Sequence, residues 1–146
     1  MLPVEQETIM EPVDELEIRN LVARVARLTD QWEKESDLTA EYTKDCVWHL
    51  EGVEPYRGHD GIVRRMREMR DAGICGPGAP MRHIVSTPEI IADPQDANAA
   101  TVISFVMMGS MSAGKPVLAG YGQYTDIVRK IGGRWFMAER RGVAFW

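Results

Sequence analysis

The chain has 146 residues, a length that suits one domain with a core of its own. Apolar residues make up 45% of the sequence and charged residues 27%, the balance of a globular protein that stays in water. A net charge of −5 and the lack of a lysine and arginine block argue against nucleic-acid binding.

Membrane and secretion signals are missing from the sequence. No apolar run reaches the roughly 18 residues of a membrane span. The acidic start, MLPVEQETIMEPVDE, lacks the basic and apolar regions of a signal peptide. Two cysteines, Cys46 and Cys75, form neither a disulfide framework nor a zinc motif. We therefore expect a cytoplasmic protein with two free thiols.

The first predicted element is a long helix. Residues 1–13 contain two prolines and are expected to form a flexible arm ahead of a single domain over residues 14–146. Asp14 followed by Glu17 has the form of a capping box, and apolar residues recur at helical spacing from Ile18 to Leu28. Asp30 lies close to that apolar stripe near the helix end, where a negative charge opposes the helix dipole. The position suggests a functional carboxylate.

Two more helices and a strand follow. We predict a short helix over residues 37–42, a strand over 46–52 and a helix over 60–70, with Val63, Met66 and Met69 facing inward. The third helix also carries four arginines with acidic residues among them, which favours a solvated helix face over a phosphate site. Residues 73–80, GICGPGAP, predict a loop that is either a lid or a plain connector.

The second half of the chain predicts strands over residues 81–87, 89–92 and 99–108, and then a hairpin over 118–141. Gly132-Gly133 is typical of the hairpin turn, which needs positive φ at both central positions. The strand over 99–108 is apolar on both faces, so we expect a second subunit to cover one of them. Helices followed by antiparallel strands make the fold class α+β.

Five segments in this order carry a family resemblance. They are DELEIRNLVARVARLTD, YTKDCVWHLEG, YRGHDGIV, MRHIVSTPEI and GYGQYTDIVRKIGGRWFMAERR. Together they resemble the SnoaL-like branch of the nuclear-transport-factor-2-like superfamily, and within it scytalone dehydratase and hexachlorocyclohexane dehydrochlorinase. The resemblance implies a cone-shaped fold, often trimeric, with three N-terminal helices packed on a curved, mostly antiparallel sheet that encloses a pocket. It also implies removal of water or HCl from a small cyclic substrate without metal or cofactor.

The resemblance implies site residues as well. Asp30 matches the aspartate of these enzymes, His83 their histidine, and Arg140 an arginine of the dehydrochlorinase. The sequence departs from the dehydrochlorinase at Val25, where that enzyme has a lysine, and from scytalone dehydratase at Thr29 and Tyr121. A substrate identical to that of either enzyme is therefore not expected.

The same residues suggest a chemistry. A neutral histidine is a competent base near pH 7, and a carboxylate on its other ring nitrogen sets its tautomer. We expect Asp30 to orient His83 in this way. We expect Arg140 either to stabilise negative charge or to pair with an acidic neighbour. Tyr121, or Tyr124 on the other strand face, is the candidate proton donor.

The predicted site thus has two groups of residues and no metal or cofactor. The catalytic group is Asp30, His83, Arg140 and Tyr121. The substrate-binding group is Val25, Trp48, Met66, Tyr124 and Phe136. We expect a lyase or isomerase acting on a small, mostly apolar cyclic molecule and assembled as a trimer or dimer. The alternatives are a non-catalytic partner like the β subunit of ring-hydroxylating dioxygenases, or a module that only binds hydrophobic ligands.

Overall fold

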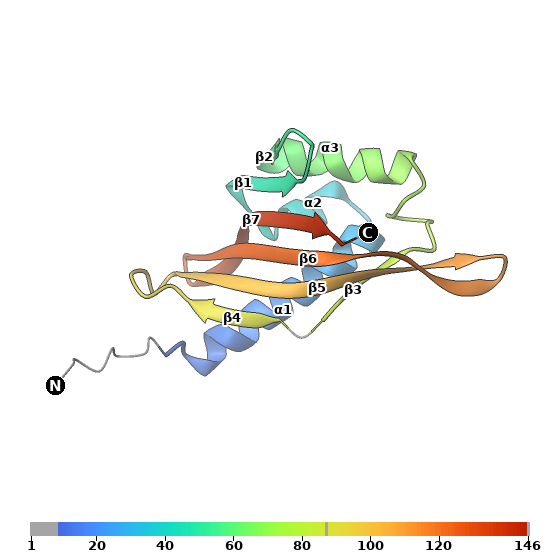
Figure 1. The fold of residues 1–146 in the computed structure, drawn as a ribbon. Helices are drawn as coiled ribbons and strands as arrows, with labels where there is room; N and C mark the ends of the chain where they lie inside the picture. Colours follow the sequence, from blue (N-terminus) through green and yellow to red (C-terminus); the bar gives the residue numbers. More distant parts are fainter. Residues whose placement is uncertain (1–8, 87, 146) are drawn as a thin grey trace.

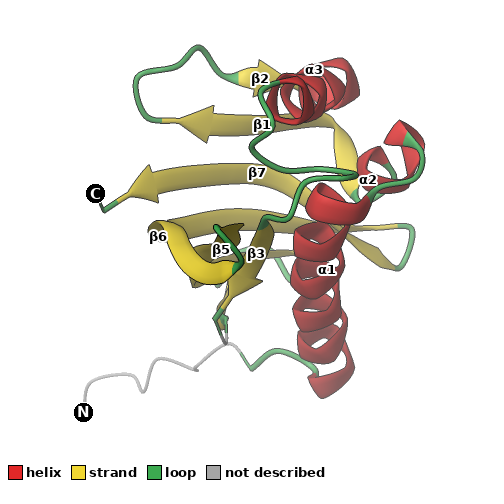
Figure 2. Ribbon diagram, turned by 90° about the vertical axis from the view of Figure 1, so that its right-hand side faces the viewer, coloured by secondary structure: helices red, strands yellow, loops and turns green. Residues whose placement is uncertain are grey.

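The computed structural model describes residues 9–86 and 88–145. Three helices lie on one side of a seven-stranded sheet (Figure 2). The elements, in chain order, are α1 (Pro12–Gln31), α2 (Glu35–Thr39), β1 (Tyr42–Leu50), β2 (Tyr56–Arg57), α3 (Gly58–Asp71), β3 (Arg82–Val85), β4 (Glu89–Ala92), β5 (Ala99–Ser112), β6 (Lys115–Ile131) and β7 (Arg134–Ala144). The expected α+β class, with three helices on a mostly antiparallel sheet, is confirmed.

The sheet has the strand order β2-β1-β7-β6-β5-β3, and β4 also pairs with β5 (Figure 1). All pairs are antiparallel except β1 with β7. The predicted turn at Gly132-Gly133 joins β6 to β7, with φ of 58° and 80° at the two glycines. A second hairpin, between β5 and β6, turns at Ala113 and Gly114. This turn was not predicted, because β5 and β6 extend beyond the segments over 99–108 and from 118 onward that the sequence pattern predicts.

The first helix begins earlier than its capping pattern predicts. Pro12 occupies the first turn, where its fixed φ suits a helix start, and Glu11 is the N-cap residue without a side-chain cap. Asp14 as N-cap is therefore wrong. Its buried carboxylate instead accepts hydrogen bonds from Lys130 Nζ at 2.7 Å and Trp135 Nε1 at 2.9 Å. Of the expected arm over residues 1–13, the first eight lie outside the described residues, and Pro12 and Val13 belong to α1.

The helices cover the core side of the sheet with apolar stripes. In α1, Ile18, Leu21 and Val25 are fully buried, as their spacing predicts. In α3, the buried residues are Ile62, Met66 and Met69, and Val63 is only half-buried. The α2 prediction was two residues late: Asp37 lies inside the helix and accepts a hydrogen bond from the Lys34 backbone N–H at 2.9 Å. Among the described residues, no helix is long and apolar enough to span a membrane.

The opposite face of the sheet carries exposed apolar side chains. On β5, Val102, Ser104 and Val106 are buried on the helix side of the sheet, and alternate residues point the other way. Phe105 is 49% exposed and packs its ring against Tyr121 and Phe145, with centroids 6.4 Å and 6.3 Å away. We refer to Phe105, Met107, Tyr121 and Phe145 as the outer patch.

Candidate functional site

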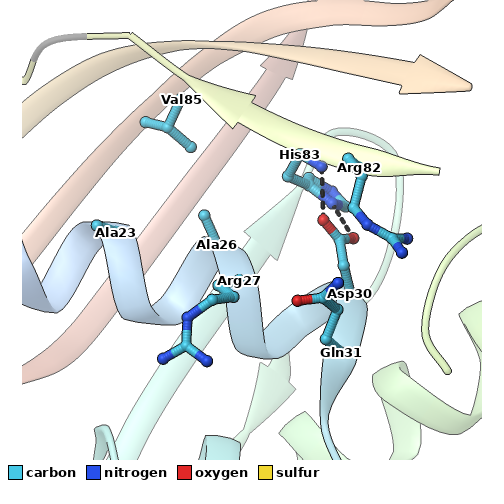
Figure 3. Close-up of a pocket in the computed structure, with 8 residues that line it drawn as sticks. All are labelled: Ala23, Ala26, Arg27, Asp30, Gln31, Arg82, His83 and Val85. Carbon is cyan, nitrogen blue, oxygen red and sulfur yellow. Dashed lines mark hydrogen bonds and ion pairs between the residues drawn. The ribbon is translucent and has the colours of Figure 1, made fainter.

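Asp30 and His83 form a hydrogen-bonded pair between α1 and β3. Asp30 Oδ1 lies 2.7 Å from His83 Nδ1, and Asp30 Oδ2 accepts the His83 backbone N–H at 2.6 Å (Figure 3). Both side chains are buried, with 2% and 7% of their surface exposed. Because a carboxylate oxygen only accepts, Nδ1 is the donor, and in the neutral ring Nε2 carries the lone pair. The pair therefore presents the imidazole as a base with a defined tautomer.

The local sequence explains this position. Asp30 is the penultimate residue of α1, whose last turn contains no basic residue to pair with it. Thr29 donates its hydroxyl back to the Val25 carbonyl at 2.7 Å and closes the final turn. On β3, His83 pairs with Met108 of β5. The strand thus supplies both the backbone N–H and the ring N–H that the Asp30 carboxylate needs.

His83 lines two hollows. One is a groove of about 310 Å³ on the side of α1 and β3, whose lining residues are drawn in Figure 3. The other is a cavity of about 500 Å³ under the helix layer. Its walls are mostly apolar and include Trp48, Leu50, Met69, Val106, Met108 and Tyr124. Gly142 lets two of these side chains pack closely against its backbone, because a Cβ there would lie 3.2 Å from Leu50 Cδ2 and 3.3 Å from the Tyr124 ring. A cavity of this size and character suits a small apolar ligand.

Only part of the predicted substrate-binding group lines this cavity. Trp48 and Tyr124 belong to its wall. Val25 and Met66 are packed in the core and are not among the residues that line it. Phe136 faces the other side of the sheet. The centre of its ring lies 4.9 Å from the Arg134 guanidinium carbon.

A β-bulge explains the position of Phe136. Simple alternation places Phe136, Ala138 and Arg140 on one face. The β6–β7 register shifts between Ile127 and Val128. Met137 and Arg140 are therefore both buried on the core side of β7. Phe136 points away from them.

The two tyrosines of β6 lie on opposite faces. Tyr124 is 8% exposed and lines the cavity, and burial raises the pKa of its hydroxyl. Tyr121 is 38% exposed and belongs to the outer patch. Tyr124 is thus the tyrosine that can meet a ligand beside His83, and we assign Tyr121 no role in this site.

Arg140 is held by Asp126 of β6. Its Nε and one terminal nitrogen bind the two Asp126 carboxylate oxygens at 2.8 Å and 2.9 Å. Both residues are almost fully buried, and neither lines the cavity. The Arg140 guanidinium also lies 4.0 Å from the centre of the Tyr124 ring. Of the two roles that the sequence left open for Arg140, the structure shows pairing with an acid on a neighbouring strand.

Cys75 and Arg65 line the cavity although the sequence suggested no role in the site for either of them. Cys75, in the glycine-rich loop, is 1% exposed, and burial raises the pKa of its thiol to about 11. Arg65 belongs to the arginine run of α3 that was expected to face solvent. Helical spacing could have shown that Arg65 is on the inner side of α3. Arg65 lies three residues after Ile62 and four before Met69, and both of these residues are buried.

In the part of the chain that the structure describes, one cluster of side chains has donor atoms close enough for a metal ion. Atoms of Asp30, Cys75 and His83 lie within 4.8 Å of one another. However, both Asp30 oxygens are already occupied by His83, and the neutral Cys75 thiol lies 3.5 Å from the Met69 sulfur. The geometry therefore fits an acid–base pair better than a ligand set.

Comparisons with known proteins agree with this architecture. The SnoaL-like domain family matches residues 11–141. A search of curated proteins finds no match to the chain. A protein of unknown function with a cystatin-like fold from Nostoc punctiforme is 24% identical, with a TM-score of 0.76, covering 92% of this chain and 93% of that one.

Two further solved structures share the fold. An NTF2-like protein from Novosphingobium aromaticivorans is 16% identical, with a TM-score of 0.79 and coverage of 91% and 82%. Hexachlorocyclohexane dehydrochlorinase LinA-type3 from Novosphingobium barchaimii is 16% identical, with a TM-score of 0.73 and coverage of 92% and 88%. Since the family match covers most of its length, this chain belongs to the SnoaL-like domain family.

Proposed function

We propose that the protein is a cofactor-independent lyase or isomerase that removes a proton from carbon in a small, mostly apolar cyclic substrate. The observation that supports this most is the Asp30–His83 pair at the wall of an apolar cavity. A buried carboxylate on Nδ1 orients the ring and stabilises it once Nε2 has taken a proton. A ligand-binding module would not need this pair.

The reaction begins with transfer of a substrate C–H proton to His83 Nε2. The electron pair left on carbon then either expels a leaving group, which completes an elimination, or moves into a neighbouring carbonyl. In the second case the proton returns at another carbon, which is an isomerisation. Tyr124 keeps its phenolic proton because burial raises its pKa, so it can donate that proton to a leaving hydroxyl.

Elimination has additional support from similarity. A structural neighbour is a hexachlorocyclohexane dehydrochlorinase, an enzyme that removes HCl. In this chain Val25 occupies the place where that enzyme is expected to carry a lysine, and Val25 is buried in the core. We therefore favour loss of water, or proton transfer alone, over loss of halide.

The first test reads the tautomer of His83 by ¹⁵N NMR of labelled protein between pH 6 and 9. We expect the neutral ring to be protonated at Nδ1 and unprotonated at Nε2. In Asp30→Asn this preference should be lost. His49 serves as an internal reference, because it does not line the cavity. Its Nε2 lies 3.3 Å from Glu139 Oε1. A ring protonated at both nitrogens throughout this range would contradict a role as base.

The second test measures proton abstraction directly. Cyclic ketones and β-hydroxy ketones are incubated with the protein in D₂O, and deuterium incorporation or water loss is followed by mass spectrometry. We expect at least one to react with the wild type. His83→Gln should lose that reaction and His49→Gln should keep it. A reaction that survives in His83→Gln would exclude His83 as the base.

A further inference from the structure

Arg65 differs from the other arginines of α3. Each of its three neighbours has a carboxylate partner on the surface. Arg64 pairs with Glu68, Arg67 with Glu35, and Arg70 with Asp71. Among the described residues, no carboxylate lies within ion-pair distance of Arg65. Its side chain lines the same cavity as His83.

The surroundings of Arg65 keep its guanidinium in place without neutralising it. It lies over two aromatic rings, 5.9 Å from the centre of Trp48 and 5.6 Å from that of Tyr56. Such cation–π contacts hold a cation but leave its N–H groups available to another acceptor. Arg65 also interacts with the Tyr56 hydroxyl, but its Nε is buried with no hydrogen-bond partner among the described residues. A buried N–H without an acceptor is costly, so it favours a ligand that supplies one.

The charge balance of the cavity points to the same kind of ligand. Guanidinium stays protonated at any physiological pH. The Cys75 thiol and the Tyr124 hydroxyl stay neutral, because burial raises the pKa of both groups. The other fixed charge in the lining is Glu51, which is exposed. Inside apolar walls, an unneutralised cation attracts an anion far more strongly than in water.

We propose that Arg65 is the anion-recognising residue of this cavity and binds a negatively charged oxygen of the substrate or of its enolate. This proposal deepens the proposed function and rests on it. When His83 Nε2 takes the proton, the C–H electron pair forms a C=C bond and the carbonyl π pair moves to oxygen. That oxygen then accepts hydrogen bonds from Arg65. Arg140 cannot serve, because Asp126 occupies its guanidinium.

The substrate class follows from this arrangement. It is a small ring system, mostly apolar, that carries either a carboxylate or a carbonyl whose α-carbon loses the proton. The apolar walls suit the ring, and Arg65 and His83, which both line the cavity, are the proposed partners of the polar end. A purely hydrocarbon or halocarbon ligand would leave Arg65 Nε without an acceptor.

Binding of matched probes tests this proposal without knowledge of the substrate. The probes are 2-naphthoate, which has a carboxylate, 2-naphthamide, which has the same shape without charge, and 2-naphthol, whose anion mimics an enolate. Affinities are measured at pH 8 by isothermal titration calorimetry and by quenching of the intrinsic tryptophan fluorescence, to which Trp48 of the cavity wall contributes. A visible shift of bound 2-naphthol to its anion reports enolate recognition, and tight binding of 2-naphthoate reports carboxylate recognition.

Four variants separate the contributions. Arg65→Met removes the charge and keeps side-chain length, and Arg65→Lys keeps the charge. Arg64→Met is the matched control, because Arg64 is exposed on the same helix and paired with Glu68. His83→Gln shows whether a charged imidazole contributes to anion binding. Unchanged 2-naphthamide affinity in a variant shows that its cavity is intact.

We expect the wild type to prefer at least one anion over 2-naphthamide by roughly tenfold or more. Arg65→Met should abolish that preference, and Arg65→Lys should retain part of it. Arg64→Met and His83→Gln should keep it. The proposal is overturned if no anion is preferred, if none of the probes binds, or if the preference survives in Arg65→Met. An anion preference that depends on Arg65, combined with no deuterium exchange, would refute the catalytic proposal and leave this one standing.

Discussion

Asp30 holds His83 at two points, the ring Nδ1 at 2.7 Å and the backbone N–H at 2.6 Å. The two bonds fix both the strand position and the ring orientation, so the imidazole cannot rotate away from the cavity without losing the carboxylate. One buried side chain therefore joins the end of α1 to β3. It also sets which nitrogen can accept a proton.

Asp30→Asn should reduce catalysis far more than it reduces stability. The asparagine oxygen can still accept one of the two hydrogen bonds, but its NH2 group favours the opposite tautomer at Nδ1 and cannot stabilise the protonated ring. We expect kcat for proton abstraction to fall by about 10²–10⁴. KM should change little. The measurement is steady-state kinetics on the substrate found by deuterium exchange, with Asp71→Asn as the exposed control. Equal activity in wild type and Asp30→Asn would contradict the proposed pair.

Arg140→Met should destabilise the fold, because it leaves the buried Asp126 carboxylate unpaired. Removing one member of a buried ion pair costs about 3–5 kcal/mol. The double variant Asp126→Leu with Arg140→Met should recover much of that loss. Urea unfolding of both variants measures the free energy of unfolding. If Arg140→Met kept wild-type stability and lost activity, Arg140 would have a role in the site.

Asp14 should make stability depend on pH at the acid end. Hydrogen bonds from Lys130 and Trp135 lower the pKa of its carboxyl, although burial opposes this. The folded-state pKa is therefore below the unfolded value of ~3.9. Its stabilisation is complete above that value and is lost as the pH falls through the folded-state pKa.

The variant Asp14→Asn isolates this effect. It should be less stable than the wild type at pH 6, and the difference should shrink toward pH 2.5. Thermal unfolding at a series of pH values measures both curves. Parallel curves over this range would show that Asp14 titrates alike in the folded and unfolded states.

We expect the outer patch to be buried at an interface with a second copy of the chain. Its aromatic rings gather on one sheet face, and a cluster of exposed rings is costly in water. We expect wild-type protein at micromolar concentration to sediment as a dimer or trimer and Phe105→Glu as a monomer. Ile131→Glu, at the β6–β7 turn and 55% exposed, is the control. A wild type that sediments as a monomer would refute the expected assembly.

Metal removal should leave the activity unchanged. The Asp30 oxygens are occupied by His83, and the raised pKa of about 11 keeps the Cys75 thiol neutral in the absence of a cation. Dialysis against EDTA followed by elemental analysis and an activity assay tests this. One equivalent of zinc that is lost in Cys75→Ser, together with activity, would instead identify a metal centre.

Much of the fold could be read from local patterns. Helical spacing predicts the buried face of α1, and Gly132-Gly133 predicts the β6–β7 turn, because both signals depend on a few adjacent residues. Asp30 and His83 were identified by resemblance, and an odd carboxylate at a helix end supported the choice. Each of these signals lies in a short segment of the sequence, within or next to the element that it predicts.

The composition of the cavity was decided only by the tertiary structure. A bulge in the β6–β7 ladder turns Phe136 away from the core-facing side of β7 that holds Arg140, and a carboxylate on the neighbouring strand then neutralises Arg140. Arg65 lines the cavity because the core side of α3 faces it. Sequence spacing places a residue on a face of its own element. Arg64 and Arg70 pair with acids of their own helix, but the partners of Arg67 and Arg140 come from other elements, and only packing brings those together.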